Sequence, residues 1–579
     1  MAHASGRPWL VGCWSDDEVS VCAAGAVRLA VVGACSVSAA QLAGYARRVR
    51  EVAQVEAALA GAHGCFHVIA SVAGRTYTRG SHSGQRQVYR AAVDGSTVCA
   101  DRSSVLARLT GAVLDPTELA LRLAGRTVPH PLAGGALWRD VHAVPPGHAV
   151  EISPDGRVLT RRWWQPPARE LPLREAAAGL RDALRRAVSL RVRPGEVVGA
   201  DLSGGMDSTS LCFLAVEAGA RLAAVTLDWR APANQDRIYA TDAARHLTGV
   251  EHILFASADV PAHFSGLDEH QDLTDEPTMA LRDGKQQQYL ADAMLARGAR
   301  WRMSGHGGDH VVQPPPAYLH RLLRHAPGAG MRHAAALRAQ HRWPRGVSVR
   351  TLLDTRSYAS WLADTATQLP KPSPPTGPGW GMRPQLPPWA SEQTIQLCRD
   401  RLHAAAQDAE PLHHERGRHA WIHTVQQAGQ VAGHLGHHAA LAGLPMHTPF
   451  CDDAVIDAAL AARPHEAATP WSYKPLLATA LRGLVPAPIL ERTTKDHCGI
   501  EWHEGLRLHR PVLAAWAGDS RLVAAGLADE EQLHRALLSP ALLTGGAVEL
   551  EATLGAEAWL RDLEHTHQPK EKDVAPTTP

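Results

Sequence analysis

The run Asp201-Leu-Ser-Gly-Gly-Met-Asp-Ser208 combines residue types that can hold a chain of phosphates. Its two glycines carry no side chain, so consecutive backbone N–H groups can surround phosphate oxygens. Its two serines add hydroxyl donors, whereas the carboxylate of Asp207 can share a site with an anion only if a cation lies between them. Mg²⁺ is the usual cation for that purpose. No lysine follows the glycines, so the run is not the Gly-Lys-Ser/Thr loop of kinases and GTPases.

A second glycine-rich run, Ser304-Gly-His-Gly-Gly-Asp309, also ends in a carboxylate. Alone it is a weak signal, but it follows the first run in the chain and comes directly after another short apolar stretch. We therefore predict that the two runs lie at neighbouring strand ends. Asp207 and Asp309 would then hold one Mg²⁺-bound pyrophosphate between them.

The first run needs a strand before it and a helix after it, and the sequence supplies both. Residues 197–202 are apolar, as in a buried strand, and the helical pattern of residues 209–218 follows. A helix N-terminus favours an anion, and ligands bind at the carboxyl edge of parallel strands. The alternation continues with strands at 222–227, 252–255 and 301–303 and helices at 236–247 and 285–296. Strands separated by helices predict a parallel, doubly wound α/β sheet.

The first part of the chain, up to residue 165, shows short strands and tight turns instead. Hairpins are expected at 65–78 and 87–101, a helix at 114–123, and strands at 149–152 and 158–164. We predict an α+β domain at 1–168 and an α/β domain with extra helices at 169–564. The Pro/Gly-rich stretch 369–388 is expected to be an extended surface loop, and the polar tail 565–579 to be disordered.

Composition limits the classes of partner. Of the 579 residues, 45% are hydrophobic and 20% are charged, as in ordinary globular proteins, and the formal net charge is +1. This balance predicts no binding to nucleic acid. No apolar stretch is long enough for a membrane span, and the N-terminus lacks the pattern of a secretory signal, so we expect a cytoplasmic protein. The nine cysteines show no CxxC spacing, which indicates neither a disulfide framework nor a zinc knuckle.

Together the two runs resemble the SGGxDS and SGxGxDE motifs of the asparagine synthetase superfamily, a group of N-type ATP pyrophosphatases. Four more segments resemble its motifs: Asp275-Glu276-Pro277, Pro449-Phe-Cys-Asp452, the helical segment that starts at Tyr473-Lys-Pro, and Arg492-Thr-Thr-Lys495. The resemblance covers residues 15–510. It implies that ATP and Mg²⁺ convert a carboxylate into an acyl-adenylate, with release of pyrophosphate, and that an amine then takes the acyl group.

The resemblance also implies roles for single residues. Lys495 would neutralise the charge that develops on pyrophosphate and on the intermediate. Either Glu276 or Asp275 would accept the proton of the amine. The implied ATP-binding residues are Leu202, Ser203, Gly204, Gly205, Asp207, Ser208, Thr226, Leu227, Ser304, Gly305 and Asp309, of which Asp207 and Asp309 would bind Mg²⁺.

The first domain is similar to the glutaminase domain of that superfamily. It retains Gly64-Cys-Phe66, Val144-Pro-Pro-Gly-His148 and Trp163-Trp164. The glutaminase nucleophile is a cysteine at the mature N-terminus, whose own α-amine serves as the base. Here residue 2 is Ala and the first cysteine is Cys13. We therefore expect no ammonia production, and an amine that belongs to the substrate.

Two branches of the superfamily use an amine of the substrate: β-lactam synthetase-like enzymes, and lasso-peptide cyclases, which join a peptide N-terminus to an Asp or Glu side chain. In the asparagine synthetases, one glutamate follows the first glycine of the second motif and another ends the motif. His306 and His310 stand at these two positions, and the run Ser-Gly-His-Gly-Gly-Asp is more like that of the cyclases. A cyclase implies a precursor peptide as substrate, with a leader peptidase and a leader-binding protein as partners. Residues 418–442 and 369–388 are our candidates for the wall that holds the peptide.

Two alternatives accompany the cyclase prediction. The chain could be a small-molecule β-lactam or amide synthetase, or an inactive relative that serves as a binding subunit. Intact Ser203, Asp207, Asp309 and Lys495 argue against an inactive relative.

The run His434-Leu-Gly-His437-His438 could bind a metal or line the substrate pocket. With 33 histidines in the chain and no second ligand set at a fixed spacing, the pocket is the better prediction.

Overall fold

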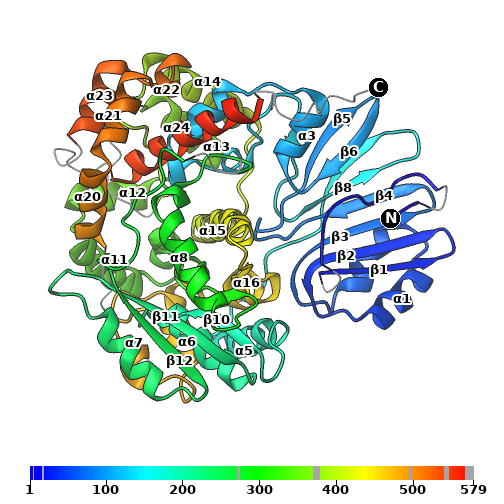
Figure 1. Ribbon diagram of the computed structural model, residues 1–579, viewed down its shortest axis with the longest axis horizontal. Coiled ribbons are helices and arrows are strands. Elements are labelled where there is room, and N and C mark those ends of the chain that lie inside the picture. Colours follow the sequence, from blue (N-terminus) through cyan, green and yellow to red (C-terminus); the bar gives the residue numbers. More distant parts are fainter. Residues whose placement is uncertain are drawn as a thin grey trace, which may run out of the picture.

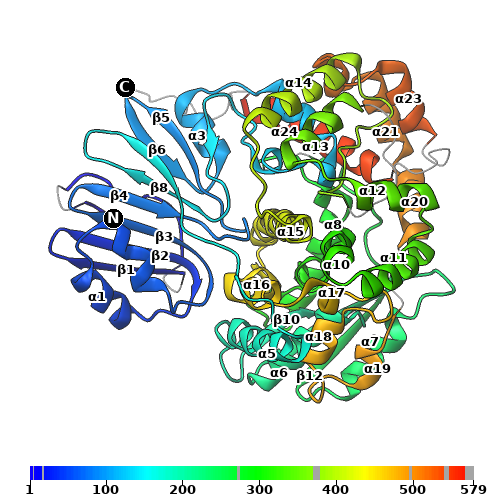
Figure 2. The same cartoon turned by 180° about the vertical axis from the view of Figure 1, so that it is seen from behind.

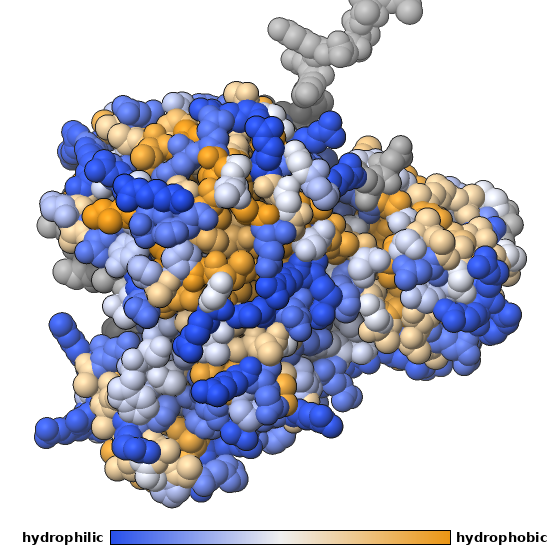
Figure 3. Space-filling view, turned by 90° about the horizontal axis from the view of Figure 1, so that it is seen from below, coloured by the Kyte–Doolittle hydropathy of each residue, from blue (hydrophilic) through white to orange (hydrophobic). Residues whose placement is uncertain are grey.

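The computed structural model describes residues 1–3, 6–15, 18–269, 274–369, 379–493, 498–539 and 547–567. A smaller β-rich body, blue to cyan in Figures 1 and 2, lies beside a larger body that contains one more sheet and most of the helices. The long helix α15 (Arg416–Leu441) is seen end-on near the centre of both views. In Figure 3, polar side chains cover much of the face seen from below, and apolar side chains gather near the middle of the larger body.

The N-terminal body contains two antiparallel sheets, with strand orders β1-β2-β3-β4-β8-β9 and β6-β5-β7. The two hairpins expected from the sequence are present as β3 with β4 and β5 with β6. The expected helix is α4, whose N-cap Asp115 accepts a hydrogen bond from the backbone N–H of Thr117. The elements are β1 Val19–Ala24, β2 Val27–Cys35, α1 Ala39–Arg48, α2 Val55–Leu59, β3 Gly64–Val72, β4 Arg75–Arg79, β5 Tyr89–Val93, β6 Ser96–Ala100, α3 Ser103–Thr110, α4 Pro116–Arg122, β7 His142–Ala143, β8 His148–Ile152 and β9 Val158–Arg162.

The larger body contains the parallel sheet that the sequence predicts. Its five strands are β10 (Val197–Asp201), β11 (Arg221–Asp228), β12 (Val250–Ala256), β13 (Arg302–Met303) and β14 (Met446–His447), in the order β12-β11-β10-β13-β14. Every neighbouring pair is parallel. The chain moves outward from β10 to β12 and then returns to β13 on the other side of β10. The strand order therefore reverses between β10 and β13, which is where open α/β sheets bind ligands.

Helices cover both faces of this sheet, so the expected doubly wound arrangement is confirmed. Val198, Ala200 and Leu202 pack into the core beneath α5 (Leu173–Ser189), α6 (Met206–Glu217) and α7 (Asp236–Arg245). Ala223 and Val225 instead pack against α8 (Gly284–Leu295). Because alternate strand residues face opposite sides, both faces must be apolar, which explains the nearly continuous apolar runs in the sequence.

The remaining helices pack around the sheet and against one another. They are α9 Gly308–Val311, α10 Leu319–His325, α11 Pro327–His341, α12 Arg345–Leu353, α13 Tyr358–Thr367, α14 Glu392–Asp408, α16 Asp453–Leu460, α17 Pro464–Ala467, α18 Pro475–Ala480, α19 Ala487–Leu490, α20 Gly499–Leu508, α21 Arg510–Gly518, α22 Arg521–Ala524, α23 Glu530–Leu538 and α24 Ala547–His567. One apolar core joins several of them to the second half of the N-terminal body, from Leu106 and Leu119 to Trp361, Trp502 and Trp559. The two bodies therefore share a core rather than meeting only at their surfaces.

Two segments differ from expectation. Of the predicted surface loop 369–388, residues 370–378 lie outside the described residues. Residues 379–388 form no helix or strand, as expected of a loop, but Trp380 is buried and packs against Tyr358 and His419, so the stretch is not wholly on the surface. Helix α24 continues to His567, into the tail predicted to start at residue 565. No helix in the described ranges is both long and apolar enough to cross a membrane.

Close contacts fix α15 against the N-terminal body. A Cβ on Gly429 would lie 2.0 Å from the carbonyl oxygen of Ser83, and one on Gly433 would lie 2.8 Å from that of Gln85. Glycines four residues apart lie on one face of the helix, and only their lack of side chains lets the backbones approach so closely.

Candidate active site

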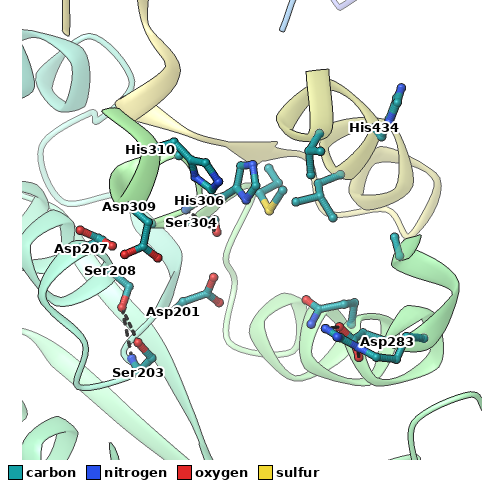
Figure 4. A pocket seen from close by; sticks show the side chains of 18 of the residues that line it. Asp201, Ser203, Asp207, Ser208, Asp283, Ser304, His306, Asp309, His310 and His434 are labelled. Atoms are coloured by element: carbon teal, nitrogen blue, oxygen red, sulfur yellow. Dashed lines mark hydrogen bonds and ion pairs between the residues drawn. The ribbon is translucent and has the colours of Figure 1, made fainter. Parts of the chain in front are cut away.

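The predicted phosphate loop connects β10 to α6 at the point where the strand order reverses. Gly204 has a φ of +71°, and a Cβ there would lie 2.5 Å from the carbonyl oxygen of Asp236. The hydroxyl groups of Ser203 and Ser208 are hydrogen-bonded to each other at 2.8 Å, as Figure 4 shows, and the backbone N–H of Gly205 donates to the Ser203 hydroxyl at 3.3 Å. The loop is thus folded on itself, with its hydroxyls and backbone donors gathered at the start of α6.

The second glycine-rich run contacts the first directly. A Cβ on Gly305 would lie 2.6 Å from the backbone nitrogen of Ser208, and one on Gly308 would lie 2.4 Å from Cγ of Asp207. The contact follows from the parallel pairing of β10 with β13, which puts both strand ends side by side. The expected adjacency of the two runs is confirmed.

Lys474 lies between the two carboxylates, and the sequence reasoning did not assign it a role. Its ammonium forms ion pairs with Asp207 and with Asp309 Oδ1, the latter at 2.6 Å. Burial disfavours the charged lysine, but the two carboxylates outweigh it and raise its pKa above the ordinary range. Lys474 has a φ of +45°, a strained conformation for a residue with a side chain, just before α18. Burial, strain and a paired charge together are typical of a functional position.

A cavity of about 730 Å³ opens beside the two runs. A cavity of this size is within the range of small-molecule sites. The predicted ATP-binding residues that line it are Ser203, Gly205, Asp207, Ser208, Thr226, Leu227, Ser304, Gly305 and Asp309. Leu202 is fully buried beneath the loop, and Gly204 faces α7; neither lines the cavity. Thr226 donates its hydroxyl to the carbonyl of Leu202, which ties the end of β11 to the start of the loop.

Asp275 and Glu276 are neighbours in the chain but point to different places. The carboxylate of Asp275 accepts the backbone N–H groups of Ser103 and Ser104, at 2.9 and 2.7 Å, and so caps α3 of the N-terminal body. Glu276 instead lines the cavity. Of the two predicted candidates for the amine's proton, only Glu276 faces the space where a substrate can bind.

The predicted catalytic residue Lys495 lies outside the described residues. Arg492, three residues before it, lines the cavity and forms an ion pair with Asp236 at 2.7 Å. Its guanidinium also lies 4.5 Å from the ring centroid of Tyr239. The start of this segment is therefore fixed against α7, next to the phosphate loop.

Other charged residues of the cavity were not predicted from the sequence. Arg302 of β13 donates to Asp201 Oδ1 from Nε at 3.0 Å and from Nη2 at 2.6 Å, so one carboxylate at the end of β10 is already neutralised. Asp283 accepts two hydrogen bonds from Arg282 and pairs with His263 Nδ1 at 2.8 Å. Burial lowers the pKa of His263, but contacts with Asp283 and Cys498 raise it to about 9. Except for the adjacent Arg282 and Asp283, these partners are distant in sequence, so no local motif could reveal them.

Asp207 and Asp309 suit Mg²⁺ as a donor set, because both are hard oxygen ligands. With Lys474 between them, they offer only part of a coordination shell, and phosphate oxygens would supply the rest, as is usual for Mg²⁺ in nucleotide sites. When bound, the ion would neutralise charge on the phosphates. Within the part of the chain that the structure describes, no group of three or more His, Cys, Asp or Glu residues is arranged to hold a metal.

Comparison with known proteins gives one family and a few distant likenesses. Residues 179–561, more than half of the chain, match the family described as asparagine synthase. The carboxyethyl-arginine beta-lactam-synthase of Streptomyces clavuligerus is 32% identical over 172 residues, which is 28% of this chain and 30% of that relative. The match thus spans less than a third of the relative's length.

Comparison with solved structures gives matches over about half of the chain. The glutamine phosphoribosylpyrophosphate amidotransferase of B. subtilis, complexed with ADP and GMP, is 12% identical, with a TM-score of 0.18 over 51% of this chain and 64% of that one. A structure described as the allosteric regulatory enzyme of purine biosynthesis is 13% identical, with a TM-score of 0.18 over 48% and 72%. Likeness at this TM-score supports no conclusion about the present chain.

Proposed function

The chain belongs to the asparagine synthase family, and from this premise we propose that it is an ATP-dependent amide ligase that adenylates a carboxylate and passes the acyl group to an amine. The observation that carries the proposal is the pair of contacting glycine-rich loops at the switch point of the parallel sheet, with Asp207, Asp309 and Lys474 between them. This arrangement provides backbone donors, one cation and two carboxylates that could bind Mg²⁺, where a triphosphate would lie in the proposed reaction.

Different residues of the site would serve different parts of the adenylation reaction. The donors of Ser203, Gly205 and Ser208 would hold the phosphates, and Lys474 would stabilise the charge that builds up on the leaving pyrophosphate. The ends of β11 and β13, at Thr226 and Ser304, would border the nucleotide on either side of β10. Lys495, as predicted from the sequence, would help to neutralise the same charge on pyrophosphate. The substrate carboxylate would attack the α-phosphorus and replace pyrophosphate.

For the substrate, we propose the side chain of Asp or Glu in a precursor peptide, closed onto the peptide's own N-terminal amine as in lasso-peptide cyclases. Helix α15, one of the two predicted wall segments, supports this reading, because Gln427, Gln430, Val431 and His434 line the cavity. None of the described residues 379–388 of the other segment does. A threaded peptide must be held folded before closure, and broad contacts must offset that loss of entropy. A leader peptidase and a leader-binding protein would be its partners.

A β-lactam synthetase-like activity is the second candidate. The observation that favours it is the 32% identity, over 172 residues, to the carboxyethyl-arginine beta-lactam-synthase. Such an enzyme would close a ring within one small β-amino acid, with the same adenylation chemistry. The two candidates differ in the size of the molecule that must fit beside the phosphate loop.

To test the proposal, purified enzyme is incubated with ATP, Mg²⁺ and the precursor peptide encoded beside the gene. The leader of the peptide is removed beforehand. We expect AMP and pyrophosphate in equal amounts, and a product lighter than the linear peptide by one water that resists carboxypeptidase. Asp207→Asn should abolish pyrophosphate release, whereas Asp182→Asn, at an exposed position of α5 that does not line the cavity, should not. ADP and phosphate as products would contradict adenylation. Dehydration of a small β-amino acid, but not of the peptide, would favour the second candidate.

A further inference from the structure

Three charged side chains from three separate elements meet at one end of the cavity. Glu276 belongs to the segment before α8, Arg122 ends α4 of the N-terminal body, and His434 lies on α15. Arg122 Nε donates to Glu276 Oε2 at 2.5 Å, and His434 Nε2 lies 2.9 Å from Glu276 Oε1. All three line the cavity. Figure 4 shows His434 well away from Ser203 and Asp207, across the cavity from the phosphate loop.

Arg122 fixes this group in place. Its Nη2 donates to the carbonyl oxygen of Gly135 at 2.6 Å, so the guanidinium is held on one side by the N-terminal body and on the other by Glu276. The side chains of Arg122 and Glu276 are only 12% and 17% exposed. Both carboxylate oxygens of Glu276 are thus occupied, one by a residue of each body, and the carboxylate cannot rotate without losing a charged partner.

The charges around His434 favour this histidine, rather than Glu276, as a proton acceptor. Burial alone would raise the pKa of Glu276, but Arg122 and His434 lower it to about 2, so the carboxylate is a poor base by itself. Burial lowers the pKa of His434, but Glu276 and, more weakly, Asp275 outweigh it and raise the pKa above the ordinary value of about 6.5. Arg122 acts in the opposite sense on His434, and His437 and His438 of the same helix also face it. An α-amine has a pKa near 8, so this shift brings the imidazole closer to the group it would deprotonate.

We propose that the amine end of the active site is completed across the two bodies: Arg122 of the N-terminal body is a positioning residue that holds Glu276 against His434, and His434 is the base that takes the proton from the attacking amine. The inference rests on the proposed amide-forming activity. It assigns the N-terminal body a part in the reaction of the larger body, and it replaces Glu276 by His434 as the group that receives the proton.

The step balances as follows. The neutral amine nitrogen forms a bond to the acyl carbon, the bond from that carbon to the phosphate oxygen breaks, and AMP leaves with the electron pair. The nitrogen loses one proton to Nδ1 of the neutral imidazole of His434, while Nε2–H keeps its hydrogen bond to Glu276. The resulting imidazolium is stabilised by the carboxylate, whose orientation depends on Arg122.

The test separates adenylation from amine transfer with hydroxylamine, a small nucleophile that is neutral at pH 7 and needs no enzyme base. Arg122→Gln, Glu276→Gln and His434→Gln are compared with Arg108→Gln, an exposed position on α3. Each variant is assayed with the leaderless precursor peptide for pyrophosphate release, for peptide hydroxamate in the presence of hydroxylamine, and for macrolactam in its absence. The pH profile of macrolactam formation is measured as well.

We expect the three site variants to form hydroxamate at the rate of the unaltered enzyme but macrolactam at least tenfold more slowly, while Arg108→Gln changes neither. Because Arg122 lowers the pKa of His434, the acidic limb of the residual Arg122→Gln activity should move to higher pH. Equal loss of hydroxamate and macrolactam, or an unaltered pH profile, would overturn the inference. If Arg122→Gln does not fold, His434→Gln carries the same comparison. An unaltered enzyme that releases no pyrophosphate with the peptide would instead overturn the proposed function, and this inference with it.

Discussion

Replacing Lys474 by methionine should destabilise the protein and make its stability depend on Mg²⁺. The side chain of Lys474 is 2% exposed, and its ammonium lies between Asp207, 13% exposed, and Asp309, 35% exposed. Methionine fills similar space but leaves two carboxylates facing each other without a cation. Breaking a buried ion pair costs about 3–5 kcal/mol. Because Asp309 is partly screened by solvent, we expect about 2–3 kcal/mol here.

The matched control is Lys285→Met, which removes an ion pair with Glu269 whose side chains are 39% and 56% exposed. An exposed pair contributes about 0–1 kcal/mol, so this variant should behave like the unaltered protein. In thermal unfolding, Lys474→Met should melt about 2–3 °C lower, because the unfolding entropy of so long a chain is large. The double variant Asp207→Asn/Lys474→Met should recover part of the loss, because one of the repelling charges is gone.

Mg²⁺ provides the second readout. In Lys474→Met the cation can take the place of the ammonium, so millimolar Mg²⁺ should raise its melting temperature more than that of the unaltered protein. Equal melting temperatures for Lys474→Met and Lys285→Met would refute the reasoning. So would a double variant less stable than Lys474→Met alone, since that would mean the two carboxylates do not repel each other.

Three further predictions concern the surroundings of the site. Gly305→Ala should weaken ATP binding at least tenfold in a calorimetric titration, because the new Cβ would lie 2.6 Å from the backbone of Ser208; unchanged affinity would contradict this contact. The pKa of His263 is raised to about 9, so its stabilising pair with Asp283 is complete below about pH 6.5 and is lost as the pH rises through 9. His263→Gln should therefore remove at most about 3 kcal/mol of unfolding free energy at pH 6 and much less at pH 10 in urea titrations, and a loss independent of pH would exclude this pair as the cause. Lys495→Ala should lower kcat far more than ATP affinity in steady-state kinetics, and a change in KM alone would argue against charge stabilisation.

The parts of the fold and site that sequence could predict are those encoded locally. The Gly-Gly turn after an apolar strand specifies the phosphate loop, because backbone sterics and strand burial act within about ten residues. The two hairpins and the N-cap at Asp115 could be predicted for the same reason, because they too depend on residues that are close together in the chain. The adjacency of the two loops could also be foreseen, since the order of parallel strands brings their carboxyl ends to one edge.

The rest depends on contacts between residues far apart in the chain. Lys474 meets Asp207 across 267 positions, and Arg122 meets Glu276 across 154. The local sequence singled out Asp207 and Glu276, but nothing in it showed that Lys474 and Arg122 would be their charged partners. Asp275 shows the reverse case: its position in a family-like motif suggested chemistry, but its carboxylate caps α3. The predicted domain limits and the role of Lys495 stay predictions.

The glycine contact between α15 and the N-terminal body has a consequence for turnover. A rotation of one body against the other would drive the carbonyl groups of Ser83 and Gln85 into the backbone of α15, where no flexible side chain can yield. For the two bodies to move apart, these backbone contacts and the shared apolar core would have to separate, so we expect nucleotide to bind without a change in their relative position. The overall dimensions of the molecule in solution, measured by X-ray scattering, should then be the same with and without bound nucleotide.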